Sequence, residues 1–297
     1  MDPFHPNERA AQRRAGLMAL PTGAGIRDFM PDQHRAFFEG LTYLFAGAVE
    51  PDGWPAATML TGAPGFIASP DEHTLRLAVR PDPADPAQAL LTPGAQMGLL
   101  GLDLSNRRRN RANGRIAAAH DGIAIVIDQS FGNCPQYIQT RSVEAVARSP
   151  GPLERFAGLD ADARVTIAAA DTFFVATAAQ GENGGVDISH RGGRPGFVRI
   201  EHDVLTIPDF RGNRFFNTLG NLLADPRAAL LFPDFETGDL TQLQGRAEVL
   251  WDQAGLEGAE RLWRFTVERG WRRRAAIPLR WTFGDYSPTT LATGTWG

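Results

Sequence analysis

The segment GAPGFI at residues 62–67 recurs in the second half of the chain as GRPGFV at residues 193–198. An apolar run precedes each copy, FAGAV at residues 45–49 and FVATA at residues 174–178. Both pairs of segments are separated by about 130 of the 297 residues, which indicates a twofold internal repeat. Because each repeat is long enough to bury its own core, the chain is expected to contain two copies of one fold.

Further along the chain, the best match between the copies has an offset of 104 residues. It aligns Arg107, Asn110 and Asn113 with Arg211, Arg214 and Asn217. The smaller offset predicts about 27 additional residues in the first copy, between Ile67 and Leu104. The proline-rich stretch 81–86 lies in that interval and is typical of a surface loop.

The pattern of apolar residues predicts short strands and short helices in each copy. Apolar and polar residues alternate through residues 198–201 and 205–207, which predicts a half-buried hairpin. Helices are expected at residues 7–20, 31–38, 160–169 and 213–223, and further strands at residues 228–232 and 240–249. Trp263, Phe265 and Trp271 are expected on a helix that packs on the second copy. Many short antiparallel strands with one crossing helix favour a small closed barrel.

These elements indicate a mainly β fold with short helices, divided into two domains. The sequence Ser-Pro-Gly-Pro at residues 149–152 is the natural linker. We therefore expect a first barrel at residues 31–150 and a second at 151–297, with a helical extension at residues 1–30 and another at the C-terminus.

The composition excludes several classes of protein. No apolar stretch is long enough to cross a membrane, and residues 1–14 are too polar for a secretory signal, so we expect a cytoplasmic protein. A single cysteine, Cys134, cannot form an internal disulfide. The net charge of −4 argues against nucleic acid as a partner. No two of the six histidines have a spacing typical of metal ligands, so no metal site is expected.

All thirty basic residues are arginines. Without lysine, the chain cannot form a Schiff base with a substrate or with pyridoxal phosphate, and it has no phosphate-binding P-loop. A bound phosphate would have to be held by arginines, hydroxyl groups or backbone N–H groups.

The sequence Arg-Gly-Asn-Arg at residues 211–214 lies where a predicted strand gives way to a predicted helix. Positive charge is unfavourable at a helix N-terminus unless an anion binds there. The arrangement therefore predicts a phosphate site. Residues 107–115 contain five arginines, and we interpret them either as the equivalent site, as a solvated basic face or, less favourably, as a nucleic-acid patch.

Residues 171–251 resemble the FMN-binding split barrels of the pyridoxamine-5′-phosphate-oxidase-like superfamily. The resemblance rests on LTIPDFRGNR at residues 205–214, NTL at 217–219, NLL at 221–223, DPR at 225–227 and GRA at 245–247, with SHRG at 189–192 ahead of them. The first half is similar more loosely, through QSFGNCPQYI at residues 129–138. The resemblance implies two tandem split β-barrels of six-stranded Greek-key type, with FMN in a cleft between barrels.

The resemblance also implies which residues bind the cofactor. Arg211, Asn213 and Arg214 would hold the phosphate, with help from Arg191. The flavin ring would lie along the other expected contacts, which are Phe197, Val198, Ile207, Pro208, Asp209 and Asn217. Four further residues are assigned on weaker grounds, namely Ser189, Asn133, Gln136 and Tyr137, the last three closing the cleft from the first half.

The chemistry of the superfamily implies an FMN-dependent oxidoreductase that acts on a small organic substrate and is reduced by NAD(P)H or a partner reductase. Vitamin B6 oxidation is not expected, because the arginine-bearing C-terminal signature is absent from residues 281–297. The alternative is a module that holds flavin or heme for storage, sensing or electron relay without turnover. A third reading is another phosphorylated ligand or a deazaflavin. Two barrels in one chain make a self-sufficient unit, and a homodimer stays equally open.

Overall fold

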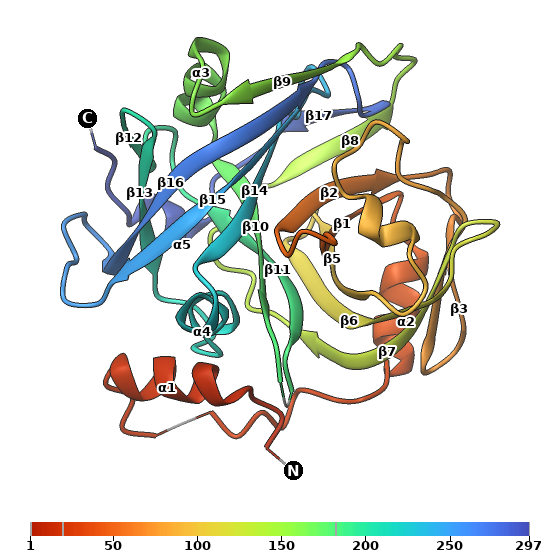
Figure 1. Cartoon of the computed structure of the whole chain (residues 1–297), viewed down its shortest axis with the longest axis horizontal. Coiled ribbons are helices and arrows are strands. Elements are labelled where there is room, and N and C mark those ends of the chain that lie inside the picture. Colours follow the sequence, from red (N-terminus) through yellow and green to blue (C-terminus); the bar gives the residue numbers. More distant parts are fainter. Residues whose placement is uncertain (1, 20, 182, 297) are drawn as a thin grey trace.

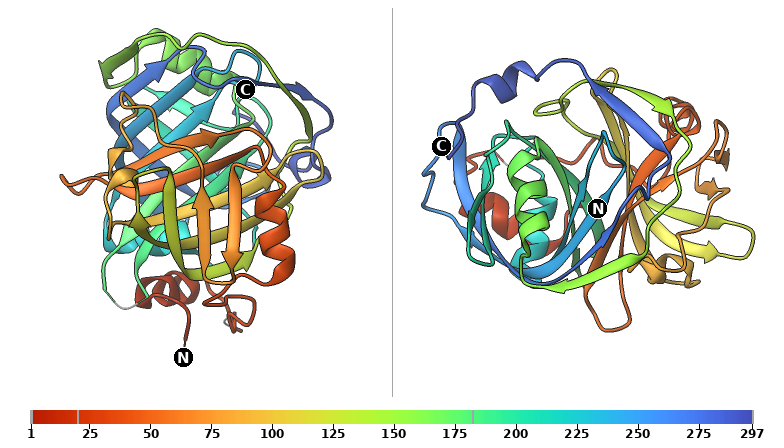
Figure 2. Two further views of the ribbon diagram at one scale, coloured as in Figure 1. Left: turned by 90° about the vertical axis from the view of Figure 1, so that its right-hand side faces the viewer. Right: turned by 90° about the horizontal axis from the view of Figure 1, so that it is seen from above.

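The computed structural model describes residues 2–19, 21–181 and 183–296, and β-strands are its dominant elements (Figure 1). Two large antiparallel sheets form two split barrels that lie side by side, the first on the right of Figure 1 and the second on the left. Figure 2 shows the same arrangement from two further directions. The fold class predicted from the sequence, mainly β with two tandem split β-barrels, is confirmed.

The first sheet has seven strands in the order β2-β1-β5-β6-β7-β4-β3. Their bounds are β1 (Tyr43–Val49), β2 (Pro55–Thr61), β3 (Ile67–Asp71), β4 (Thr74–Leu77), β5 (Gln96–Asp103), β6 (Arg108–Ala118) and β7 (Ile123–Gly132).

The second sheet follows the order β11-β10-β14-β15-β16-β13-β12, with β9 (Leu153–Ala157) paired to β16. Their bounds are β10 (Thr172–Ala179), β11 (Gly185–Gly192), β12 (Arg199–Glu201), β13 (Val204–Phe210), β14 (Arg227–Pro233), β15 (Leu240–Leu250) and β16 (Ala259–Arg273). When β1 and β10 are each counted as the first strand of their barrel, the two strand orders are identical.

The helices are short. Before each barrel lies one helix, α2 (Asp32–Glu39) or α3 (Ala161–Ala169), and both agree with the predicted helices. Between the fourth and fifth strands, the first barrel has the 3-10 helix η1 (Gln88–Leu91) and the second has α4 (Asn217–Ala224). The N-terminal helix α1 (Pro6–Arg14) lies below the second barrel against α4 (Figure 1).

The repeated glycine-rich segment forms the same turn in both barrels. A Cβ on Gly62 would lie 2.3 Å from Cγ of Phe66, and a Cβ on Gly193 would lie 2.3 Å from Cγ of Phe197. The last glycine of each turn has a positive φ, 87° at Gly65 and 86° at Gly196, which side chains disfavour. The repeat in sequence is therefore a repeat of a turn that needs glycine at two positions.

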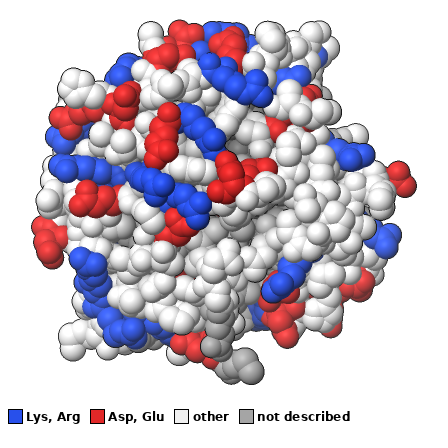
Figure 3. Space-filling view, in the orientation of Figure 1, with Lys and Arg blue, Asp and Glu red and all other residues white. Residues whose placement is uncertain are grey.

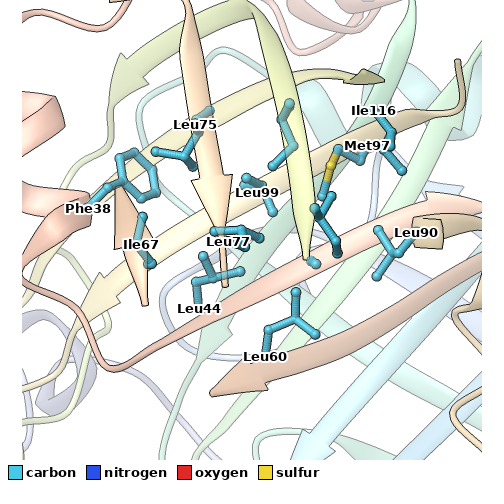
Figure 4. Packing of buried hydrophobic residues seen from close by; sticks show 14 of the residues in the cluster. Phe38, Leu44, Leu60, Ile67, Leu75, Leu77, Leu90, Met97, Leu99 and Ile116 are labelled. Atoms are coloured by element: carbon cyan, nitrogen blue, oxygen red, sulfur yellow. The ribbon is translucent and has the colours of Figure 1, made fainter. Parts of the chain in front are cut away.

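Each barrel has its own apolar core, and a third cluster joins them. Figure 4 shows the first core, in which Phe38 of α2 lies beside Leu75 and Leu77 of β4 and Leu99 of β5. The joining cluster includes Phe45 of β1, whose ring stacks on Phe174 of β10 with centroids 3.5 Å apart. Because these two phenylalanines occupy equivalent strands, the barrels meet about an approximate twofold axis.

The strand pairing corrects the predicted alignment of the two copies. Phe45 pairs with Leu100 across β1 and β5, and Phe174 pairs with Leu231 across β10 and β14. Leu100 therefore corresponds to Leu231, and the offset stays near 130. The predicted shift to an offset of 104, with about 27 additional residues in the first copy, is wrong. The mistaken alignment matched two arginine-rich segments of different structure, one a strand and the other a loop.

The arginine-rich segments differ from the predicted helix starts. Helix α4 begins at Asn217 rather than near residue 213, because Arg214 and Phe216 have φ values of 62° and 64°, outside the helical region. In the first half, the arginines from Arg108 onward lie on strand β6. Arg211 and Arg214 therefore lie in the loop before α4 rather than in its first turn, and the arginines of β6 lie on a strand.

Two other predicted helices are also corrected. Trp263, Phe265 and Trp271 lie on the long strand β16, where positions two apart share one face, and Trp263 and Phe265 are buried in the second core. At the N-terminus, the helix predicted for residues 7–20 ends at Arg14, and Leu20 lies outside the described residues.

The C-terminal region is a strand followed by a single helical turn rather than a helical extension. Strand β17 (Leu279–Phe283) pairs with β8 (Arg141–Ala145), and α5 (Pro288–Leu291) follows it. The end of the chain therefore returns to the segment that connects the two barrels. No helix in the described ranges is both long and apolar enough to span a membrane.

Candidate functional site

A pocket opens between the two barrels, and we call it the interbarrel pocket. The first half contributes strand β6 and the segment 133–137, and the second half contributes β11, β13, the loop 212–216, α4 and the start of β16. The residues that line it are Arg109, Arg111, Asn133, Gln136, Tyr137, Ser189, His190, Arg191, Gly192, Phe197, Pro208, Asp209, Phe210, Gly212, Asn213, Arg214, Phe216, Asn217, Thr218, Leu219, Glu260 and Arg261.

Most of the residues predicted to bind the cofactor line this pocket. They are Arg191, Phe197, Pro208, Asp209, Asn213, Arg214 and Asn217, together with Ser189, Asn133, Gln136 and Tyr137. Three others do not line it. The side chains of Val198 and Ile207 lie in the core of the second barrel, and Arg211 is exposed, with its carbonyl accepting a hydrogen bond from the Tyr137 hydroxyl at 3.1 Å.

Several arginines in the pocket are neutralised by carboxylates of the second barrel. Nη1 of Arg111 lies 2.7 Å from Oδ1 of Asp187, and Nη1 of Arg191 lies 2.6 Å from Oδ1 of Asp209. The same Asp209 also pairs with the buried Arg261. Because each of these charges already has a partner, they form the fixed framework of the pocket.

Arg109 is different, because no described carboxylate lies within ion-pair distance of it. Its only hydrogen-bonding contact to another side chain among the described residues is with His190, where Nη1 lies 3.4 Å from Nδ1. Its Nε is buried and has no partner. Burial, followed by the charge of Arg111, lowers the pKa of Arg109 to about 9, so the guanidinium still carries its charge at neutral pH.

His190 is buried beside this charge. Burial, followed by repulsion from Arg109, lowers the pKa of its imidazole well below the ordinary value, so the ring is neutral at pH 7. If Nδ1 accepts from Arg109, the proton lies on Nε2, which is buried without a partner. The pocket therefore presents unmatched donors from Arg109 and His190.

Unpartnered polar atoms gather around the same point. Besides those on Arg109 and His190, they include Nε of Arg111, Nε of Arg191 and Oδ1 of Asn133. A buried donor without an acceptor costs free energy of about 1–3 kcal/mol, and the cost is higher for a charged group. An anionic or oxygen-rich ligand in the pocket would satisfy the donors on Arg109, Arg111, Arg191 and His190 and offset that cost, whereas Oδ1 of Asn133 is an acceptor and would need a donor.

An aromatic wall closes the other side of the pocket. Tyr137 stacks on Phe210 with ring centroids 5.2 Å apart. The segment 133–137 passes so close to β11 that a Cβ on Gly192 would lie 2.0 Å from the Tyr137 carbonyl oxygen. Glycine at position 192 therefore lets a segment of the first half close a pocket built mainly by the second half.

Sequence reasoning missed the arginines that the first barrel contributes. Arg109 and Arg111 were interpreted as part of a helix start, a solvated face or a nucleic-acid patch, but strand β6 directs them into the pocket. The available signal was their spacing, since Arg109, Arg111 and Asn113 lie two residues apart and share one face of a strand.

On the face shown in Figure 3, arginine and acidic side chains are interspersed over the second barrel.

Comparisons with known proteins agree with this architecture. The family model described as pyridoxamine 5′-phosphate oxidase matches residues 159–276. No curated protein sequence matches the chain.

Three of the solved structures that resemble the chain each cover less than half of it. A FAD-binding protein from Mesorhizobium loti is 16% identical over 42% of this chain and 99% of its own, with a TM-score of 0.30. HupZ of Group A Streptococcus is 16% identical over 38% of this chain and 91% of its own, with a TM-score of 0.31. A Clostridium acetobutylicum protein related to general stress protein 26, of the pyridoxinephosphate oxidase family, is 16% identical over 42% and 92%, with a TM-score of 0.29.

The family match coincides with the barrel that supplies β11, β13 and α4 to the pocket, from α3 to the end of β16. Residues 159–276, which include most of the second barrel, are therefore similar to the pyridoxamine 5′-phosphate oxidase family.

Proposed function

We propose that the chain binds flavin mononucleotide in the interbarrel pocket and uses it as the cofactor of an oxidoreductase. The observation that carries the proposal is Arg109, a largely buried guanidinium whose only side-chain hydrogen-bonding contact among the described residues is a neutral histidine. Such a charge is costly in an empty pocket and becomes favourable when a phosphate or another oxygen-rich group binds. The superfamily of the second barrel supports a flavin as that ligand.

The lining of the pocket suits the two ends of FMN. Asn213 and Arg214 are exposed or half-buried in the loop before α4, where a phosphate could enter from solvent. Arg109 and His190 lie at the buried side and offer donors to oxygen atoms of the nucleotide. Tyr137 provides an aromatic surface against which a flat ring can pack.

A bound flavin would supply hydride or electron transfer, which the side chains of the pocket cannot supply themselves. The residues of this chain would bind the cofactor, orient it and exclude water from one side. We expect reduction by NAD(P)H or a partner reductase, a small organic substrate, and a cytoplasmic site of action in which Cys134 stays reduced.

The experiment has two stages. The purified protein is denatured, and the released small molecules are identified by chromatography and mass, which distinguishes FMN from FAD, a deazaflavin or heme. The flavin-loaded protein is then mixed with NADH or NADPH and an electron acceptor. Release of FMN together with turnover supports the proposal; release of FMN without turnover reduces the protein to a flavin-binding module, and absence of any flavin contradicts it.

A further inference from the structure

The approximate twofold axis that relates the two barrels also relates the interbarrel pocket to a second pocket. We call this second pocket the counterpart pocket. Strand pairing establishes the correspondence. Leu100 pairs with Arg111 in the first barrel, and its equivalent Leu231 pairs with Gln242 in the second, so Arg111 corresponds to Gln242. Two residues back on the same strands, Arg109 corresponds to Leu240.

The other wall of the two pockets corresponds in the same way. Phe45 pairs with Met59, and its equivalent Phe174 pairs with His190, so Met59 corresponds to His190. The adjacent pairs match Thr58 with Ser189 and Leu60 with Arg191. The counterpart pocket is lined by Met59, Leu60, Thr61, Val79, Arg80, Pro81, Asp82, Asp85, Leu153, Leu240, Gln242, Arg273, Ala276 and Ile277.

The cationic and ring donors of the interbarrel pocket are therefore replaced by apolar side chains in its counterpart. Leu240 stands in the position of Arg109, and Met59 stands in the position of His190. Leu60 replaces Arg191. Two arginines line the counterpart pocket at other positions: Arg273 is paired with Asp82, with Nη1 2.5 Å from Oδ1, and Nη1 of Arg80 donates to the His120 carbonyl at 3.3 Å.

In the counterpart pocket, the carboxylate of Asp85 accepts hydrogen bonds from the polar groups that remain. Asp85 accepts hydrogen bonds from the hydroxyl of Thr58, from Nε2 of Gln242 at 3.3 Å and from the backbone N–H of Ala87 at 2.8 Å. In the interbarrel pocket, the equivalents of Thr58 and Gln242 are Ser189 and Arg111, whose side chains are in contact. Asp85 thus satisfies Thr58 and Gln242 in the counterpart pocket, whereas in the interbarrel pocket Ser189 and Arg111 contact each other and Arg111 pairs with Asp187.

We infer that the chain binds one flavin, in the interbarrel pocket, and that the counterpart pocket is silent because apolar residues replace Arg109, His190 and Arg191 while Asp85 already satisfies Thr58 and Gln242. The inference rests on the proposed function. It assigns different roles to the two barrels: the second barrel holds most of the cofactor, and the first contributes Arg109, Arg111 and the segment 133–137.

The test counts flavins on the intact protein. Wild-type protein is saturated with FMN and examined by native mass spectrometry, and the variants Arg109→Leu and Leu240→Ala are treated in the same way. We expect one FMN per chain in the wild type and in Leu240→Ala, and roughly 30-fold weaker binding in Arg109→Leu. Circular dichroism confirms that each variant is folded, and the wild-type count stands even if a variant does not fold.

Two FMN per chain in the wild type would overturn the inference while leaving the proposed function intact. A single FMN that is lost from Leu240→Ala and retained with full affinity by Arg109→Leu would overturn it too, because the flavin would then occupy the counterpart pocket. A wild-type protein that takes up no FMN at all would instead remove the proposed function, and the inference with it.

Discussion

In the interbarrel pocket, strand β6 of the first barrel presents Arg109 to His190 on β11 of the second. In the counterpart pocket, β15 of the second barrel presents Leu240 to Met59 on β2 of the first. The strand order and the pairing of the flanking strands are the same around both pockets, so the sheets do not distinguish them, although α4 lines only the interbarrel pocket. If FMN binds as proposed, a ligand site in this fold depends on a few side chains at equivalent strand positions, and an internal repeat in sequence need not give a repeated function.

The largest expected effect comes from breaking the contact on which both pockets depend. Phe45 is fully buried and stacks on Phe174 where the barrels meet. Replacing Phe45 by Ala should lower the free energy of unfolding by about 3–5 kcal/mol, because a large cavity forms in the joining cluster. Urea denaturation measures the change.

The matched control is Phe283→Ala, because Phe283 is 46% exposed and should cost less than about 1 kcal/mol. Equal losses in the two variants would mean that the joining cluster contributes no more than an exposed surface contact.

A smaller effect on stability is expected from a substitution that disturbs the interbarrel pocket and not its counterpart. The change Gly192→Ala would place a methyl group 2.0 Å from the Tyr137 carbonyl oxygen and force the segment 133–137 away from β11. We expect a loss of about 2–3 kcal/mol in stability, with weaker flavin binding. Gly212→Ala is the control, because no atom lies within 4 Å of its Cβ position. Thermal unfolding compares the two, and an unchanged Gly192→Ala variant would show that the segment does not pack as described.

A substitution at Arg109 tests whether the difference in charge between the two pockets determines which of them binds FMN. The change Arg109→Leu makes the interbarrel pocket resemble its counterpart and should weaken FMN binding by about 2 kcal/mol, roughly 30-fold, through loss of a charge-assisted hydrogen bond. The same change should raise the melting temperature of the flavin-free protein, because it removes a buried charge without a carboxylate partner.

Fluorescence titration measures the affinity. Arg115→Leu serves as the control, since Arg115 lies on the same strand but is exposed and pairs with Asp128 on the surface. If both variants bound FMN as the wild type does, Arg109 would have no part in the site.

The last prediction concerns pH and a carboxyl group that contacts a residue of the interbarrel pocket. Glu8 of α1 accepts a hydrogen bond from Asn217 of the pocket. Burial, followed by the charge of Asp187, raises its pKa from 4.5 to about 8. A carboxyl whose pKa is raised on folding favours the folded state below pH 4.5, and this contribution is lost as the pH rises through about 8.

Melting temperatures of the wild type and Glu8→Gln, measured from pH 5 to pH 9, check this prediction. The wild type should lose stability relative to the variant as the pH increases across that range. A constant difference between the two proteins would show that Glu8 does not titrate in the folded state.

The sequence was sufficient to predict the fold class, because the repeated turn and the alternating strands are local signals. The hairpin of β12 and β13 and the helix α3 were predictable for the same reason. Much of the pocket on the second barrel was also predictable, through the resemblance of residues 205–214. The contribution of Arg109 was not, since it depends on how β6 of one barrel meets β11 of the other, and no local pattern encodes that meeting.

The predicted start of α4 and the predicted alignment of the repeats were wrong for a related reason. Arg214 and Phe216 adopt positive φ values that these residue types rarely take, so the sequence around them is typical of a helix that begins earlier. The offset of 104 came from matching arginines by composition, whereas strand pairing fixes the true correspondence of Leu100 with Leu231.

A crystal structure of the protein grown with FMN tests the central claim most directly. The account predicts density for one flavin between β6 and β11, with an oxygen of the nucleotide within hydrogen-bonding distance of Arg109, and Asp85 still held by Thr58 and Gln242 in the counterpart pocket. Flavin density in the counterpart pocket, or an interbarrel pocket without flavin in crystals that take up FMN elsewhere, would contradict it.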